Sequence, residues 1–222
     1  MLDLIKQEQF ELSVLDFLNT KKILPGLVFI GGTMLRLCHG LERYSTDLDF
    51  WLIDKEGSKR LFKDIRHCLE ERFTLTDAAA KFHTLLFEVR SAEYPRHLKI
   101  EIRKQEIKTR LEQNIAFSKH STVQVLVKTP SLADMMSAKV AALLDRREIR
   151  DAFDIEFLLK RGVSLADDRK ILEGLLKNIN SFSKNDYTVK LGSLLEPSIR
   201  KHYVSRNFTF LKMAIQEKLN AA

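Results

Sequence analysis

Two aspartates, Asp47 and Asp49, lie two positions apart in a segment that is otherwise apolar. In a β-strand, side chains at positions i and i+2 point to the same face, so both carboxylates would point to one place. The apolar neighbours Leu48, Phe50 and Trp51 favour a partly buried strand over a solvated turn. Two carboxylates held together repel each other unless a cation lies between them. Because Mg²⁺ binds carboxylate oxygens while it contacts substrate phosphates, this pair predicts a metal-dependent phosphate-transfer site.

A glycine pair followed by a hydroxyl residue, Gly31-Gly32-Thr33, comes directly after the apolar run 28–30. We predict that Thr33 caps a helix that ends at Gly40. Glycines at a helix start leave backbone N–H groups open to bind phosphate. Gly31, Gly32 and Thr33 are therefore the predicted binding residues for the β- and γ-phosphates of a nucleoside triphosphate.

The elements around these residues can be predicted from the spacing of apolar side chains. Helical spacing predicts an amphipathic helix over residues 3–19 and a charged helix over 55–73. Alternating apolar residues predict strands over 84–90 and 97–103, joined by a turn as a hairpin or as adjacent antiparallel strands. Further short strands are predicted at 28–30, around Asp47 and Asp49, and at 123–127.

From Ser131 onward the apolar residues recur at helical spacing to the end of the chain. Helices are predicted from 131 to about 144, from 149 to 160, and near 166–179, 187–196 and 208–219. The change of period predicts two domains, a mixed domain over residues 1–130 and a helical domain over 131–222. The fold class is therefore α+β, with a mixed β-sheet core, flanking helices and an all-helical C-terminal half.

A second group of charged residues lies in the helical half. Lys139 falls among apolar residues of a predicted helix, where an unpaired ammonium is unfavourable. It therefore needs an anion, and a triphosphate is one candidate. Asp151 and Asp154 share a face of the next helix, because they are three positions apart. The alternative is a salt bridge between helices, made by Lys139 or Arg150 with these aspartates.

The string GGTMLRLCHGLERYSTDLDF over residues 31–50 combines these features. It resembles the nucleotidyltransferase superfamily, whose signature is Gly-Gly or Gly-Ser followed by Asp-x-Asp, and specifically the AbiEii/AbiGii toxin branch that includes the MenT toxins. The resemblance covers roughly residues 28–53 and 98–162. It implies a nucleotidyltransferase-type fold in which the helical domain completes the active-site cleft.

The resemblance also implies roles for further residues. Superfamily members carry a third carboxylate on a neighbouring strand, and Glu101 is the best match, with Glu88 as its rival and an ordinary exposed strand glutamate as the alternative. Ser45 would steady the metal-binding loop or touch phosphate, and Arg43 could equally be a structural ion-pair partner. In the C-terminal motif, Lys139 would contact the triphosphate and Asp151 or Asp154 would complete the site.

The composition limits the class of protein. Apolar residues make up 45% and charged residues 30% of the chain, as in soluble globular proteins, and no apolar run approaches the ~20 residues of a membrane span. Two cysteines, Cys38 and Cys68, are too few for a disulfide framework, so we expect reduced thiols in a cytoplasmic protein. The histidines are scattered without zinc-site spacing. The net charge of +7 makes a polyanionic partner plausible.

The expected reaction follows from the resemblance. Two Mg²⁺ ions held by Asp47, Asp49 and Glu101 would serve the transfer of a nucleoside monophosphate from an NTP to an acceptor, which in MenT-like toxins is the 3′ end of tRNA. A toxin of this family would also have a partner antitoxin. A basic segment beside Glu101 is the candidate RNA phosphate track or an ordinary basic strand edge. Its residues are Arg96, Lys99, Arg103, Lys104, Lys108 and Arg110.

Two other functions remain open at this point. One is a nucleotidyltransferase that modifies a small cationic molecule, as aminoglycoside-modifying enzymes do, although the basic residues near the site disfavour it. The other is a binding protein that has kept the fold and lost catalysis, which intact Asp47, Asp49 and Lys139 disfavour.

Overall fold

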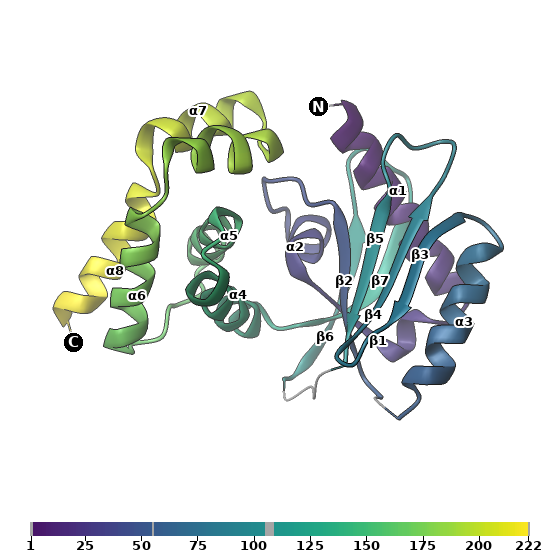
Figure 1. Ribbon diagram of the computed structural model, residues 1–222. Helices are drawn as coiled ribbons and strands as arrows, with labels where there is room; N and C mark the ends of the chain where they lie inside the picture. Colours follow the sequence, from purple (N-terminus) through teal and green to yellow (C-terminus); the bar gives the residue numbers. More distant parts are fainter. Residues whose placement is uncertain (1, 55, 105–108, 222) are drawn as a thin grey trace. The chain divides into compact units, whose positions relative to one another are not determined.

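The computed structural model describes residues 2–54, 56–104 and 109–221, and Figure 1 shows its helices and strands. The chain divides into two compact units, Met1–Ser131 and Leu132–Ala222. The first unit contains the strands and the second is helical. The predicted α+β class is confirmed.

The first unit is built on a five-stranded mixed sheet with the order β1-β2-β5-β4-β3. The strands β2 and β5 are parallel, whereas the other neighbours are antiparallel. A separate two-stranded sheet pairs β6 with β7. The bounds are β1 Leu27–Ile30, β2 Asp47–Leu52, β3 Thr74–Ala80, β4 Thr84–Arg90, β5 Leu98–Arg103, β6 Leu111–Phe117 and β7 Gln124–Pro130.

One face of the five-stranded sheet forms the core of this unit. Strand β4 points Leu85, Phe87 and Val89 inward, and all three are fully buried. Helices α1 (Leu2–Thr20) and α3 (Ser58–Glu70) cover this face, and Phe62 of α3 stacks on Phe87 with ring centroids 5.1 Å apart. On the opposite face, Asp47 and Asp49 of β2 and Lys99 and Glu101 of β5 are charged and half-exposed. The charged side chains of the opposite face are therefore the ones that could take part in a reaction.

The helical unit begins with two packed helices. Leu143 of α4 and Ile155 and Leu158 of α5 are fully buried, which is the pattern expected of helices that share a core. The bounds are α4 Leu132–Arg146, α5 Ile149–Lys160, α6 Arg169–Asn180, α7 Pro197–Arg206 and α8 Thr209–Ala221. Helix α2, Gly31–His39, belongs to the first unit and links β1 to the loop before β2.

The differences from the predicted elements have physical causes. Strands β3 and β6 were not predicted, because β3 is a largely exposed edge strand and β6 exposes the apolar residues Ile115 and Phe117. The helical stretch predicted near 187–196 is present, but it is not an α-helix. Instead, a π-helical turn (Asp186–Leu191) and a 3₁₀ turn (Gly192–Leu194) precede α7. The helix predicted from residue 55 begins at Ser58, and Lys55 lies outside the described residues.

Candidate active site

The parallel pair β2 and β5 brings the predicted carboxylates to one face of the sheet. Along β2, Leu48 and Phe50 are buried, while Asp47 and Asp49 are half-exposed on the other face. Asp49 lies directly opposite Glu101 in the strand register. Because side chains of residues that pair across strands point to the same face, Asp47, Asp49 and Glu101 share the half-exposed face.

The start of helix α2 lies against the second aspartate. The helix follows β1 without a loop, and Gly31 has a φ of +83°, which favours glycine. A Cβ at Gly31 would lie only 2.6 Å from Oδ2 of Asp49. Only a glycine therefore lets the helix start, with its open N–H groups and positive dipole end, come this close to the carboxylate.

The second glycine lies against the loop that leads to β2. A Cβ at Gly32 would collide with the guanidinium of Arg43 and would lie 2.9 Å from Oγ of Ser45. Arg43 is buried and donates from Nη1 to the backbone oxygen of Tyr44 at 3.1 Å. Both residues therefore pack on the glycine turn, and a structural role of Arg43 in shaping the loop fits this geometry.

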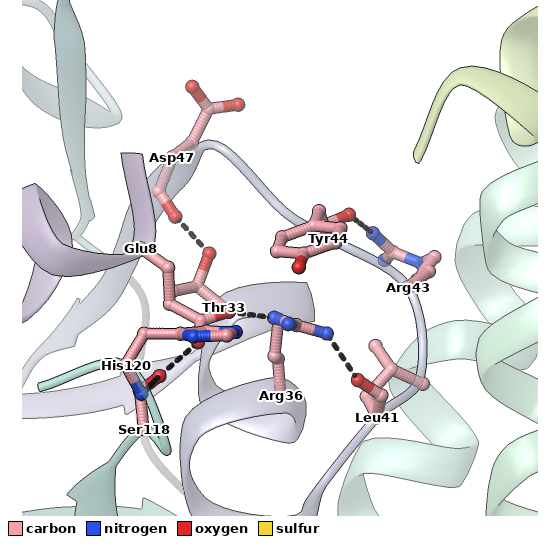
Figure 2. A network of polar contacts seen from close by, with 9 residues as sticks. All are labelled: Glu8, Thr33, Arg36, Leu41, Arg43, Tyr44, Asp47, Ser118 and His120. Carbon is pink, nitrogen blue, oxygen red and sulfur yellow. Dashed lines mark hydrogen bonds and ion pairs between the residues drawn. The ribbon is translucent and has the colours of Figure 1, made fainter. Parts of the chain in front are cut away.

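The interpretation of Thr33 as a helix cap is wrong. The helix begins at Gly31, and its cap residue is Ile30, which makes no side-chain capping bond. The hydroxyl of Thr33 instead donates to the backbone oxygen of Asp47 at 2.6 Å, and the residue is buried. Figure 2 shows the Asp47 carboxylate turned away from this bond. Thr33 thus ties helix α2 to the first residue of β2.

The loop before Asp47 is held by a residue that the sequence analysis missed. Arg36 of α2 donates from Nη1 to the backbone oxygen of Leu41 at 3.1 Å and lies 3.8 Å from the ring centroid of Tyr44. Its Nε pairs with Glu8 of α1, which also accepts from the hydroxyl of Ser118 (Figure 2). The signal for this network is a set of polar residues on the otherwise apolar, buried face of amphipathic helix α1. They are Gln7, Glu8 and Glu11, all buried.

Glu101 is surrounded by cations on its own strand. Its carboxylate accepts from Lys99 at 2.8 Å and from Arg103 at 3.2 Å. Burial alone would raise the pKa of Glu101, but the hydrogen bonds and charges of Lys99 and Arg103 outweigh burial and lower it. Conversely, the hydrogen bond to Glu101, together with the charges of Glu101, Asp47 and Asp49, raises the pKa of Lys99. The carboxylate face therefore attracts a positive charge.

The rival carboxylate, Glu88, lies one strand further from β2. It is opposite Lys99 in the β4–β5 register, and it bonds to Nδ1 of His97 at 2.6 Å and to the hydroxyl of Thr76 at 3.0 Å. These bonds lower the pKa of Glu88. By register, Glu101 is the better candidate for a third carboxylate.

The residues of this face fit a hard divalent cation by their chemistry. Asp47 and Asp49 offer carboxylate oxygens, which Mg²⁺ prefers, at a surface that already attracts the ammonium of Lys99. Among residues 2–54, 56–104 and 109–221, no three His, Cys, Asp or Glu side chains are grouped closely enough to hold a metal ion. Ligation by Glu101 therefore stays a prediction that requires its carboxylate to leave Lys99 and Arg103.

The charged residues of the helical unit form salt bridges with one another. Nζ of Lys139 lies 2.7 Å from Asp154 and 3.4 Å from Asp151, and both aspartates are fully buried. Arg146, which the sequence analysis missed, binds Asp151 with Nε at 2.8 Å and Nη2 at 2.7 Å. The salt bridge between helices that was the alternative for Lys139 is present. A contact of Lys139 with triphosphate stays a prediction.

The basic segment after β4 is only partly available to a phosphate backbone. Lys99 and Arg103 pair with Glu101, and Nζ of Lys104 donates to the backbone oxygen of Lys81 at 2.7 Å. Arg96 and Arg110 are exposed. Lys108 lies outside the described residues. The RNA track stays a prediction.

Comparisons with known proteins identify the family of the chain. The model of the family described as nucleotidyl transferase AbiEii toxin, type IV toxin–antitoxin system, matches residues 16–220. The chain belongs to this family. The predicted membership in a family of nucleotidyltransferase toxins is confirmed. A search of curated protein sequences gave no match.

Solved structures with the same fold include two from Helicobacter pylori. The protein JHP933 superposes with a TM-score of 0.58 at 21% identity, over 96% of this chain and 92% of the other. A putative nucleotidyltransferase gives 0.59 at 18% identity, over 96% and 95%. MenT4, a nucleotidyltransferase toxin from Mycobacterium tuberculosis, gives 0.51 at 18% identity, over 96% and 88%. These likenesses extend the AbiEii-type fold over nearly the whole chain.

Proposed function

We propose that this AbiEii-family chain is a Mg²⁺-dependent nucleotidyltransferase that transfers a nucleoside monophosphate from an NTP to the 3′ end of tRNA, and that it is a toxin neutralised by an antitoxin. The observation that carries the proposal is the placement of Asp47 and Asp49 on one half-exposed face, with Gly31 at the start of α2 against Asp49. This arrangement puts a cation-attracting surface beside N–H groups suited to phosphate.

In the proposed site, one set of residues would bind the metal ion and another would bind the nucleotide. Asp47, Asp49 and Glu101 would hold Mg²⁺, which when bound would neutralise phosphate charge while an acceptor hydroxyl attacks the α-phosphate of the NTP and pyrophosphate leaves. The N–H groups of Gly31 and Gly32 and the hydroxyl of Ser45 would bind the triphosphate. Thr33 would act on this face through its bond to Asp47.

The helical unit carries the second group of proposed site residues. Lys139 would contact the triphosphate, and Asp151 or Asp154 would hold its ammonium in place, as their 3.4 Å and 2.7 Å contacts allow. Arg146 binds Asp151 by two hydrogen bonds, and Asp154 has the shorter contact with Lys139. Asp154 is therefore the better candidate for the residue that orients Lys139.

The proposed acceptor is supported by charge. The chain carries a net charge of +7, and Arg96, just before β5, and Arg110, just before β6, are exposed. Such residues bind nucleic-acid phosphates without regard to sequence. None of the helices in the described residues has the length and apolar character of a membrane span.

The test is an incubation of the full chain with total tRNA, Mg²⁺ and each α-labelled NTP in turn. Label should enter tRNA with at least one NTP, and the Asp49→Ala variant should give none. The matched control is Asp64→Ala, because Asp64 is an exposed residue of α3 in the same unit. Incorporation that survives in Asp49→Ala would contradict the proposed site.

A second experiment identifies the acceptor position on tRNA. Periodate oxidation of the terminal ribose removes the hydroxyl groups of the tRNA 3′ end, so oxidised tRNA should take up no label. Label on oxidised tRNA would move the acceptor to another position. No label with any NTP would rule out tRNA, and a protein or a small molecule would then be tested as acceptor.

A further inference from the structure

Helix α1 carries a buried amide whose bonds lead to the candidate active site. Gln7 is fully buried, although a polar side chain is unfavourable there unless it is hydrogen-bonded. Its Nε2 donates to two backbone oxygens, those of Thr46 and His97, each at 3.3 Å. The two acceptors are 51 residues apart in the chain, so a single side chain joins two distant segments.

Both acceptors occupy the same kind of position. Thr46 immediately precedes Asp47, the first residue of β2, and His97 immediately precedes Leu98, the first residue of β5. Because β2 and β5 are parallel, their first residues lie at the same edge of the sheet. The two N–H groups of the Gln7 amide therefore hold the starts of the two strands together.

We propose that Gln7 is a positioning residue that sets the start of the Asp47–Asp49 strand relative to the strand of Glu101. The inference rests on the proposed function, since it concerns the same metal-binding face. We call the two hydrogen bonds of the Gln7 amide, to Thr46 and His97, the clamp. Asp47 follows Thr46 directly, so loss of the clamp would move the Asp47 carboxylate with respect to Glu101. Metal sites tolerate little displacement, because ligands must be held within about 0.5 Å of the productive geometry.

The same helix offers a matched control. Gln9 also uses Nε2 to donate to a backbone oxygen, that of His120 at 2.6 Å. His120 lies between β6 and β7, which form a separate two-stranded sheet, so the bond of Gln9 is made to neither strand start. Replacing either glutamine by methionine removes one amide of the same size from the same helix. Only Gln7→Met removes the clamp.

The test measures Mn²⁺ binding to the full chain without nucleotide or RNA, by titration calorimetry, for the wild type, Gln7→Met and Gln9→Met. Loss of a partner that orients ligands weakens metal affinity by about 10–100-fold, so Gln7→Met should bind Mn²⁺ about tenfold more weakly. The Mn²⁺ affinity of Gln9→Met should stay within about twofold of that of the wild type, because the Gln9 amide bonds to neither Thr46 nor His97. Thermal unfolding of each variant checks that it is folded.

The outcomes separate the two proposals. Wild type that binds Mn²⁺ while Gln7→Met binds it equally well would overturn the positioning role and leave the proposed function standing. Wild type that binds no Mn²⁺ would overturn both. If Gln7→Met does not fold, Gln7→Asn replaces it, since asparagine keeps the amide but is too short to reach both oxygens. Affinity equal to the wild type in folded Gln7→Asn would then overturn the role.

Discussion

Two pairs of aspartates, Asp47 with Asp49 and Asp151 with Asp154, are each close in sequence but differ in surroundings. Asp47 and Asp49 are half-exposed on a strand, on a face that raises the pKa of the neighbouring Lys99. Asp151 and Asp154 are fully buried on a helix, where Lys139 and Arg146 provide two positive charges. In the proposed function Asp47 and Asp49 bind a cation from solution, whereas Asp151 and Asp154 are paired with cations of their own fold.

This difference separates activity from stability. Removing one charge from the half-exposed pair should leave the fold intact and remove the binding of a cation. Removing one charge from the buried pair leaves a partner uncompensated, which is strongly unfavourable in a protein interior. The predictions below test this division.

The largest effect is expected from Asp49→Asn. Loss of a metal ligand removes several kcal/mol of transition-state stabilisation, so nucleotide transfer should fall at least about a thousandfold. The midpoint of urea unfolding, followed by circular dichroism, should change little, because Asp49 is half-exposed. A variant that loses both activity and most of its stability would show that Asp49 is structural and would break the comparison.

In the helical unit, Asp154→Asn should act first on stability. It leaves the buried ammonium of Lys139 without its closest carboxylate, at 2.7 Å, and breaking a buried pair costs about 3–5 kcal/mol. The free energy of unfolding from urea titration measures the loss. The control is Asp167→Asn, which removes an exposed partner of Lys218 and should cost less than about 1 kcal/mol. Equal losses in the two variants would contradict a buried, tightly held pair.

Much of the site could be predicted from the sequence because its signals are local. Glycine at a positive φ, two aspartates on one strand face and apolar alternation in β4 and β5 follow from neighbouring residues alone. The membership in the AbiEii family was recognised from one string of residues. The placement of Glu101 opposite Asp49 needed the parallel pairing of β2 with β5, and the strand alternation alone gave only its face.

The missed residues act over long sequence separations. Arg36 and Glu8 are 28 positions apart, and Glu8 and Ser118 are 110 apart, so no local pattern relates them. The Thr33 hydroxyl was predicted to cap a helix by accepting from a backbone N–H, whereas it donates to the backbone oxygen of Asp47, and no local pattern shows that Asp47 lies within its reach. Polar residues on the apolar face of amphipathic helix α1 were a signal that could have been used, because buried polar residues need hydrogen-bond partners.

A smaller effect on stability is expected at Glu11, which lies in helix α1 three positions after Glu8. It is fully buried, and neither carboxylate oxygen has a hydrogen-bond partner among the described residues. Burial, assisted by the charges of Glu8 and Asp47, raises the pKa of Glu11 well above its ordinary value. Glu11→Met should therefore stabilise the protein at pH 7 by about 1–3 kcal/mol, the range for a buried group without a partner.

The pH dependence of this gain has a definite sign. A raised folded-state pKa means that the contribution of Glu11 to stability is fully present below its unfolded pKa of about 4.3 and is lost as pH rises through the folded value. The gain from Glu11→Met should thus be larger at pH 8 than at pH 5 in urea titrations. Glu42→Met, at an exposed position of the same unit, is the control. A gain that does not change with pH would contradict a neutral Glu11.

The smallest effect, and the sharpest test of the half-exposed face, is Thr33→Val. The change removes the hydroxyl that donates to the backbone oxygen of Asp47 and keeps the shape, so it should cost about 0.5–1.5 kcal/mol. If the hydroxyl acts only through Asp47, kcat falls, KM for the NTP is unchanged, and Thr33→Ser restores both stability and kcat. A raised KM at unchanged kcat would instead mean that the hydroxyl contacts phosphate directly. The expected fall in kcat would show that the backbone at Asp47, as well as its carboxylate, must be held in place for the strand pair to bind its cation.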